Sequence, residues 1–170
     1  LYLLAGSMRL WGRSELAARL PNLAASMAGL ALVYPLCVRL YGRREGLWAV
    51  LFLALNPFDI LFARTAFTDP LLVMWTLAAL TAAAVQRWLW AGLAMGLAFA
   101  TKQHALLLVP LVFLIGQVAP TPAGRSSQGR MRVTRWAAPL LARLPSVLGF
   151  ALPFALVYWW DAQRWLIRPG

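Results

Sequence analysis

Hydrophobic residues form long runs along this chain, and polar residues are concentrated in the short stretches between them. The first run, residues 22–40, is close to the roughly 20 residues that an α-helix needs to cross a bilayer. We expect five further runs to form membrane helices: residues 47–63, 68–87, 88–101, 105–119 and 144–160. The pattern therefore predicts an all-α, polytopic transmembrane domain with about six spans.

Residues 1–21 are amphipathic, because charges interrupt their apolar positions. Arg9 and Arg13 divide this stretch into pieces too short to cross a bilayer. A helix of this kind lies in the membrane interface, with its apolar face toward the acyl chains. We expect two interfacial helices separated at Gly12. The second should end at Pro21, because proline cannot continue the hydrogen-bond pattern of a helix.

Prolines mark two boundaries farther along the chain. Asn56-Pro57 lies in the last third of the second run, and we expect the helix to bend there because proline frees backbone carbonyls. Asp69-Pro70 combines an N-cap residue with a proline at the first helical position, which predicts a helix start. The stretch between these boundaries forms the expected mouth of a helical hairpin. It carries three ionisable residues: Asp59, Arg64 and Asp69.

A polar triplet, Lys102-Gln103-His104, divides the apolar residues 88–119. One helix over all of these residues would be about 48 Å long at 1.5 Å per residue, against a hydrocarbon core of about 30 Å. We therefore expect two short helices with a break at Lys102.

The composition indicates an integral membrane protein and argues against nucleic-acid binding. The chain is 62% hydrophobic and 12% charged, whereas soluble domains have about 45–50% apolar and about 25% charged residues. The net charge of +11 comes almost wholly from arginines at the ends of apolar runs. That placement is typical of contact with anionic lipid headgroups, so the bilayer is the expected partner.

Five arginines lie in residues 120–143, a polar loop rich in Pro, Gly and Ser. Lys and Arg are concentrated in cytoplasmic loops of membrane proteins, so we place this loop in the cytoplasm. Alternation of the spans then puts the candidate site residues on the outer side: Arg19, Asp59, Arg64, Asp69, Lys102 and His104.

These residues have a structural and a functional interpretation. Asp69 either caps a helix or joins Arg64 at a helix N-terminus, where anions are stabilised. Asp59 either pairs with Arg64 or serves as a polar group in a cavity. Lys102 and His104 either form a polar interfacial turn or bind the phosphate of a lipid that enters from the bilayer. His104 has no second His, Cys or close carboxylate in the sequence, so this segment predicts no metal site.

Several short motifs follow one another along residues 1–119. They are Leu1-Tyr2-Leu3-Leu4, Trp11-Gly12-Arg13-Ser14-Glu15, Arg19-Leu20-Pro21, Leu40-Tyr41-Gly42-Arg43-Arg44, Asn56-Pro57, Arg64-Thr65 with Asp69, and Thr101-Lys102. In this order and spacing the chain resembles the protein mannosyltransferase and aminoarabinose transferase superfamily, the family-39-like polytopic glycosyltransferases of the GT-C fold. Each motif alone is loose, and the resemblance weakens after the arginine-rich loop.

The resemblance implies an enzyme that transfers a sugar from a polyprenyl-phosphate donor to a protein, lipid or glycan acceptor on the extracytoplasmic face. In that family the catalytic acidic residue lies in the first outer loop, just before the segment that matches Leu1-Tyr2. We therefore expect this chain to be a piece of a longer protein whose general base precedes residue 1. A divalent cation, if the reaction uses one, would be bound mainly by residues outside this chain.

The resemblance also implies roles for the outer residues. Arg64 and Lys102 would stabilise the developing charge of the leaving phosphate, with Arg19 and His104 behind them. Asp69 would hold one of these cations or the acceptor. The sequence departs from the family at Gln103, where the family often has Gly, and this changes the expected shape of the Lys102 turn. The richness in Ala, Leu and Arg is typical of a GC-rich bacterial genome, so the expected location is a bacterial cytoplasmic membrane.

Two other classes of protein compete with the enzyme. A transporter or flippase subunit would place ionisable groups and broken helices near the bilayer midplane and often contains inverted repeats. Here the charges lie near the ends of the runs, and no convincing repeat is present. A membrane scaffold would use the same polar turns only to satisfy its interfaces.

Overall fold

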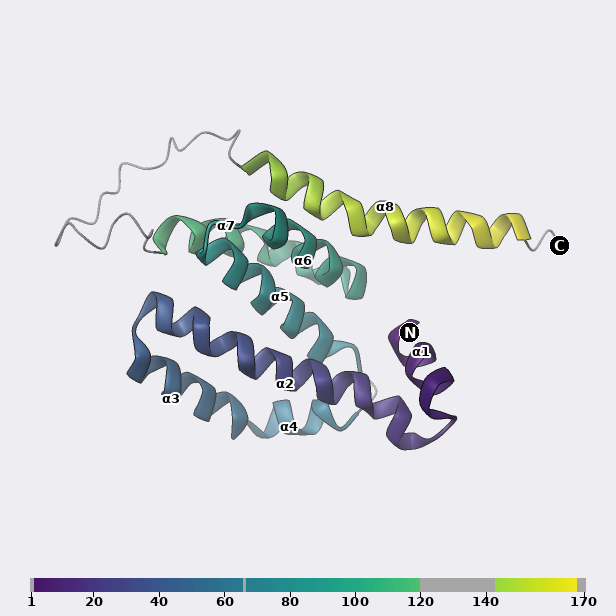
Figure 1. The fold of residues 1–170 in the computed structure, drawn as a ribbon, viewed down its shortest axis with the longest axis horizontal. Helices are drawn as coiled ribbons and strands as arrows, with labels where there is room; N and C mark the ends of the chain where they lie inside the picture. Colours follow the sequence, from purple (N-terminus) through teal and green to yellow (C-terminus); the bar gives the residue numbers. More distant parts are fainter. Residues whose placement is uncertain (1, 66, 120–142, 168–170) are drawn as a thin grey trace. The chain divides into compact units, whose positions relative to one another are not determined.

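The computed structural model describes residues 2–65, 67–119 and 143–167, and within them all regular structure is helical, which confirms the predicted all-α class. Figure 1 labels the helices in chain order. Their bounds are α1 (Tyr2–Trp11), α2 (Glu15–Leu40), α3 (Arg43–Ala54), α4 (Pro57–Ala63), α5 (Asp69–Ala84), α6 (Trp88–Thr101), the 3₁₀-helix η1 (Gln103–Leu108), α7 (Val109–Val118) and α8 (Leu144–Ile167). The chain divides into two compact units, Leu1–Leu77 and Ala78–Gly170, and each is described by itself.

In the first unit, α2 is one helix of 26 residues. The predicted break at Gly12 is confirmed, since α1 ends at Trp11 and Gly12 has a φ of +82°. The predicted helix end at Pro21 is wrong, because α2 continues through this residue. The reason is a hydrogen bond from outside the helix. Pro21 has no N–H for the carbonyl of Ala17, and the hydroxyl of Ser7 donates to that carbonyl instead, at 2.5 Å.

The predicted bend at Asn56-Pro57 is confirmed. Helices α3 and α4 meet there at an angle of 59°. The side chain of Asn56 accepts a hydrogen bond from the backbone N–H of Phe58 at 3.1 Å, and Pro57 begins α4. Because α4 has its own capped start with proline at its first position, its axis points in a different direction from that of α3.

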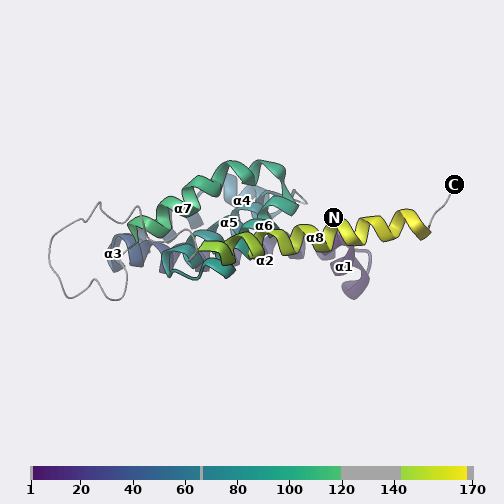
Figure 2. The same ribbon diagram turned by 90° about the horizontal axis from the view of Figure 1, so that it is seen from above.

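The second unit is built around the pair α6 and α8, which lie side by side (Figure 1, Figure 2). Glycines allow their backbones to approach closely. A Cβ atom on Gly92 would collide with the backbone of Ser146, and one on Gly149 would collide with the carbonyl of Leu89. Small residues at such contacts are typical of helices that pack in membranes.

The predicted break at Lys102 is also confirmed. Lys102 ends α6 with an extended backbone (φ −149°, ψ 132°), and η1 and α7 follow it. At the other end of α6, the side chain of Gln86 donates a hydrogen bond to the carbonyl of Gly116 in α7 at 2.5 Å. The polypeptide from α6 to α7 is therefore a hairpin of two short apolar segments.

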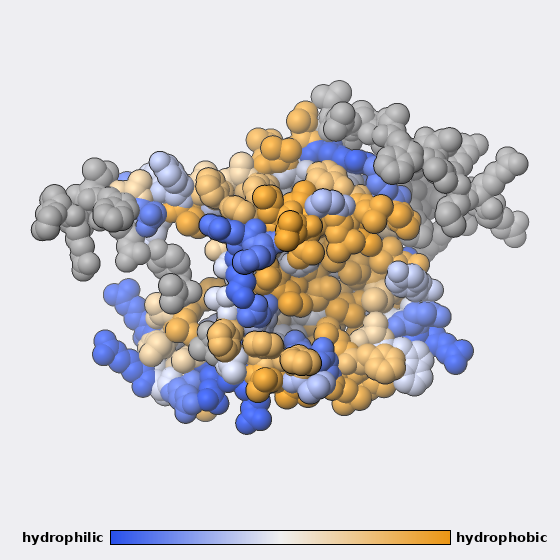
Figure 3. Space-filling model, turned by 180° about the vertical axis from the view of Figure 1, so that it is seen from behind, coloured by the Kyte–Doolittle hydropathy of each residue, from blue (hydrophilic) through white to orange (hydrophobic). Residues whose placement is uncertain are grey.

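Among the described residues, two helices are long and apolar enough to cross a membrane, Glu15–Leu40 and Leu144–Gln163, and the bent pair α3–α4 makes a third if it counts as one span. Three apolar segments are shorter: Asp69–Ala84, Trp88–Thr101 and Gln103–Val118. Two or three of the six predicted spans are thus accounted for by length and composition. Figure 3 shows hydrophobic side chains over much of the visible surface, and Phe52 and Leu148 are 71% and 70% exposed. Residues 120–142, most of the predicted cytoplasmic loop, lie outside the described residues.

Candidate functional site

The turn between α4 and α5 carries Arg64, the central cation of the predicted site. Arg64 ends α4, with its backbone N–H donating to the carbonyl of Leu61 at 3.2 Å and its side chain exposed. The hydroxyl of Thr65 donates to the carbonyl of Phe62 at 2.9 Å. The rings of Phe62 and Phe67 meet edge to face, with centroids 5.9 Å apart. These contacts fold the turn back onto the end of α4.

A buried amide on α2 holds the same turn. Asn22 is 4% exposed, and its Nδ2 donates hydrogen bonds to the carbonyls of Thr65, at 2.6 Å, and Phe67, at 2.5 Å. Both amide protons are therefore used on backbone groups that flank the turn. Sequence reasoning missed this residue. Its signal was a polar side chain directly after Pro21, at the start of a run that is otherwise apolar.

The structure settles the question of whether Asp59 pairs with Arg64. Asp59 lies in the first turn of α4 and is partly exposed. Within the described part of the chain, neither Asp59 nor Arg64 forms an ion pair. Arg19, by contrast, pairs with Glu15 one turn earlier on α2, and both side chains are largely exposed. Such exposed pairs contribute little to stability, so Arg19 remains available to a ligand.

Asp69 is the first residue of α5, whereas the sequence predicted Pro70 as the first helical residue. The backbone N–H of Leu72 donates to the carbonyl of Thr68 at 3.1 Å, so α5 begins at Asp69, one residue earlier than predicted. The start differs by one residue because Pro70 fits the second helical position as well as the first. Asp69 still lies at the helix N-terminus, where a carboxylate is stabilised by the helix dipole.

Lys102 and His104 belong to the second unit. The backbone N–H of Lys102 donates to the carbonyl of Ala98 at 2.9 Å, and its own carbonyl accepts from the N–H of Ala105 at 3.1 Å. Lys102 is half-buried and His104 is exposed in η1. The two side chains thus belong to the same break between helices. The convergence of Arg64 with Lys102 stays a prediction.

The described residues contain no cluster of three or more His, Cys, Asp or Glu side chains that could hold a metal ion. Arg64 presents a planar guanidinium that can bind a phosphate through two N–H groups, and Lys102 presents a compact point charge. Both lie at helix ends beside apolar segments, as ligands for a membrane-borne anion should.

The helices of this chain, their membrane-length apolar segments and their exposed hydrophobic side chains define a helical membrane protein. Residues 1–126 match the family described as dolichyl-phosphate-mannose-protein mannosyltransferase, and the chain belongs to that family. The family consists of membrane glycosyltransferases that depend on a polyprenyl-phosphate sugar. The resemblance inferred from the ordered motifs is thereby confirmed. No curated protein matches the chain, and no solved structure does.

Proposed function

We propose that this chain serves a membrane glycosyltransferase that moves a sugar from a polyprenyl phosphate to an acceptor hydroxyl on the extracytoplasmic face. The observation that carries the proposal is the family match over residues 1–126, which includes both cationic turns. In the reaction, the acceptor oxygen forms a bond to the anomeric carbon of the sugar. The bond from that carbon to the phosphate oxygen breaks, and the polyprenyl phosphate leaves with an added negative charge.

The residues of this chain would act on that charge. Arg64 and Lys102 stabilise the leaving phosphate, because fixed cations in a partly dry site act strongly on charge that develops in the transition state. Arg19 and His104 assist in binding the donor. Asp69 orients one of the cations or the acceptor, and Asp59 contributes a polar group. By the resemblance, a carboxylate takes the proton of the acceptor hydroxyl.

The proposed topology has six crossings. Helix α2, the bent pair α3–α4, and helices α5, α6, η1–α7 and α8 each cross once, starting after the interfacial α1. The short segments need a locally thin bilayer or neighbouring protein, since α6 has 14 residues and spans roughly 21 Å at 1.5 Å per residue. The arginine-rich residues 120–143 then lie in the cytoplasm, and both cationic turns lie outside, at a bacterial cytoplasmic membrane.

The direct test is transfer by the purified full-length protein from radiolabelled polyprenyl-phosphate mannose, compared with the same sugar supplied as a nucleotide sugar. The proposal predicts labelled product from the lipid-linked donor alone. A transporter would instead move the labelled lipid or sugar across sealed vesicles without forming a new glycosidic bond. Movement of the label without a new glycosidic bond would therefore show that the protein is a transporter and not a glycosyltransferase.

A further inference from the structure

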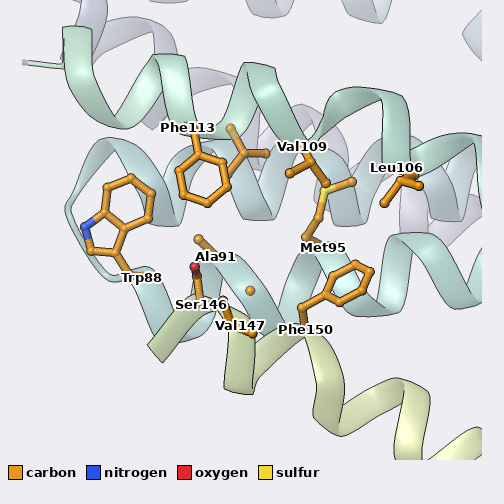
Figure 4. A pocket seen from close by; sticks show the side chains of 11 residues that line it. Trp88, Ala91, Met95, Leu106, Val109, Phe113, Ser146, Val147 and Phe150 are labelled. Carbon is orange, nitrogen blue, oxygen red and sulfur yellow. The ribbon is translucent and has the colours of Figure 1, made fainter. Parts of the chain in front are cut away.

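The second unit contains an apolar cavity of about 210 Å³ between α6, η1–α7 and α8. Figure 4 shows Met95 of α6, Val109 of α7 and Phe150 of α8 converging on it. Its lining is almost entirely carbon. In a membrane protein such a space suits a hydrocarbon chain, because each methylene group that leaves water adds to the binding free energy.

A cation lies at one end of this cavity. The guanidinium carbon of Arg143 lies 5.1 Å from the ring centroid of Trp88 and 5.8 Å from that of Phe113, two residues that line the cavity. The two rings are stacked, with centroids 5.7 Å apart. Trp88 is 8% exposed and packs against Gly116, where a Cβ atom would collide with its ring. The aromatic platform under Arg143 is therefore fixed in place.

The chain cannot neutralise this cation from within the second unit. Nine of the sixteen Lys and Arg residues lie in residues 78–170, together with a single acidic residue, Asp161. Asp161 lies 18 positions beyond Arg143, which is roughly 27 Å along a helix. Among the described residues, Arg143 forms no ion pair. An anion for Arg143 must come from outside the unit.

The cavity end at Arg143 is distinct from the proposed donor site. Trp88 is the first residue of α6, and Lys102 follows the last one. The 14 residues between these ends extend roughly 21 Å. If α6 crosses the bilayer, Arg143 and Lys102 therefore lie toward opposite leaflets.

We propose that this cavity binds an anionic phospholipid, with one acyl chain between α6, α7 and α8 and the phosphate on Arg143. Stacking on the rings uses the faces of the guanidinium and leaves its N–H edges free for a phosphate. Basic pockets between membrane helices bind anionic lipid headgroups in this way.

The test measures lipid bound to the delipidated protein in a mild detergent, by native mass spectrometry with added phosphatidylglycerol or phosphatidylcholine. Wild type should bind phosphatidylglycerol roughly tenfold more tightly, because both lipids carry a phosphate but the choline ammonium of phosphatidylcholine cancels its net negative charge, and an interaction with a net charged partner is worth about that ratio. Arg143→Gln should lose this preference and Arg143→Lys should keep part of it. The matched control is Arg87→Gln, because Arg87 is an exposed cation at the same end of α6 with no ring contact in the described structure.

A second variant tests the acyl-chain part of the proposal without touching the charge. Val147 lines the cavity and is 60% exposed, so Val147→Phe fills the space with little effect on folding. It should weaken the binding of both lipids. Thermal unfolding of each variant shows that the helices are intact. Equal binding of the two lipids by wild type, or an undiminished preference in Arg143→Gln, would overturn the proposal. Neither result depends on sugar transfer, so the proposed function is tested separately.

Discussion

At the residue scale, one serine compensates for a proline inside the longest helix of the first unit. Pro21 removes a backbone donor from α2, and Ser7 of α1 satisfies the carbonyl of Ala17 in its place. A buried acceptor without a partner costs about 1–3 kcal/mol, so this contact removes a penalty for continuing the helix through Pro21. It also ties α1 to α2.

We expect Ser7→Ala to lower the free energy of unfolding by about 0.5–1.5 kcal/mol, the usual net value of one hydrogen bond. In a Pro21→Ala background the same change should have a smaller effect, because the alanine N–H can donate to Ala17. Thermal or denaturant unfolding of the four variants in detergent gives the coupling energy. Additive effects would mean that Ser7 does not replace the missing proline donor.

Asn22 acts at the same scale on the candidate site. Asn22→Asp keeps the size of the side chain and removes both donors to Thr65 and Phe67, so the turn that carries Arg64 should loosen. We expect a loss of about 1–3 kcal/mol in stability and slower sugar transfer. Leu23→Ala is the matched control, because Leu23 is the next residue and is 46% exposed. If the Asn22→Asp variant were as stable and active as this control, Asn22 would not be needed to position the turn that carries Arg64.

At the scale of elements, the sequence predicted the breaks that depend on local backbone chemistry. Gly12, Asn56-Pro57 and Lys102 each interrupt a helix where predicted, since a glycine, a proline or a polar residue acts on its own neighbours. The predicted helix end at Pro21 was wrong because the hydroxyl that replaces the missing N–H of this proline comes from another helix. Asn22 was missed for the same reason, as its acceptors lie 43 and 45 residues away.

The pairing of α6 with α8 depends on glycines at the contact. We expect Gly149→Ala to destabilise the second unit by about 1–3 kcal/mol, because its Cβ atom would meet the backbone of Leu89 and Leu93. Gly6→Ala is the control, since a Cβ atom on Gly6 has open space and alanine favours a helix. Unfolding followed by circular dichroism compares the two. Equal stability of both variants would mean that α6 and α8 do not pack closely at Gly149.

At the scale of the whole molecule, the six-span topology predicts the side of each loop. Lys102 should face outside and Arg130 inside. Single cysteines at these positions, in a Cys37→Ser background, should react with an impermeant thiol reagent in intact cells at position 102 only. Position 130 should react after the cells are opened. Labelling of both positions from one side would mean that residues 88–119 cross the membrane once.

We propose that Arg64 and Lys102 each stabilise the leaving phosphate of a polyprenyl-phosphate sugar. The rate of transfer from that donor by Arg64→Ala and Lys102→Ala, each purified and shown to be folded, tests this proposal directly. Each variant should be slower by about 10²–10³, the usual effect of removing one electrostatic donor from such a site. Lys102→Arg should retain more activity than Lys102→Ala because it keeps the charge.

The control for this measurement is Arg44→Ala, an exposed cation in the first turn of α3 that the topology places on the opposite side. It should transfer sugar at the wild-type rate. Near-normal rates in both Arg64→Ala and Lys102→Ala would contradict this proposal and show that these turns do not bind the phosphate.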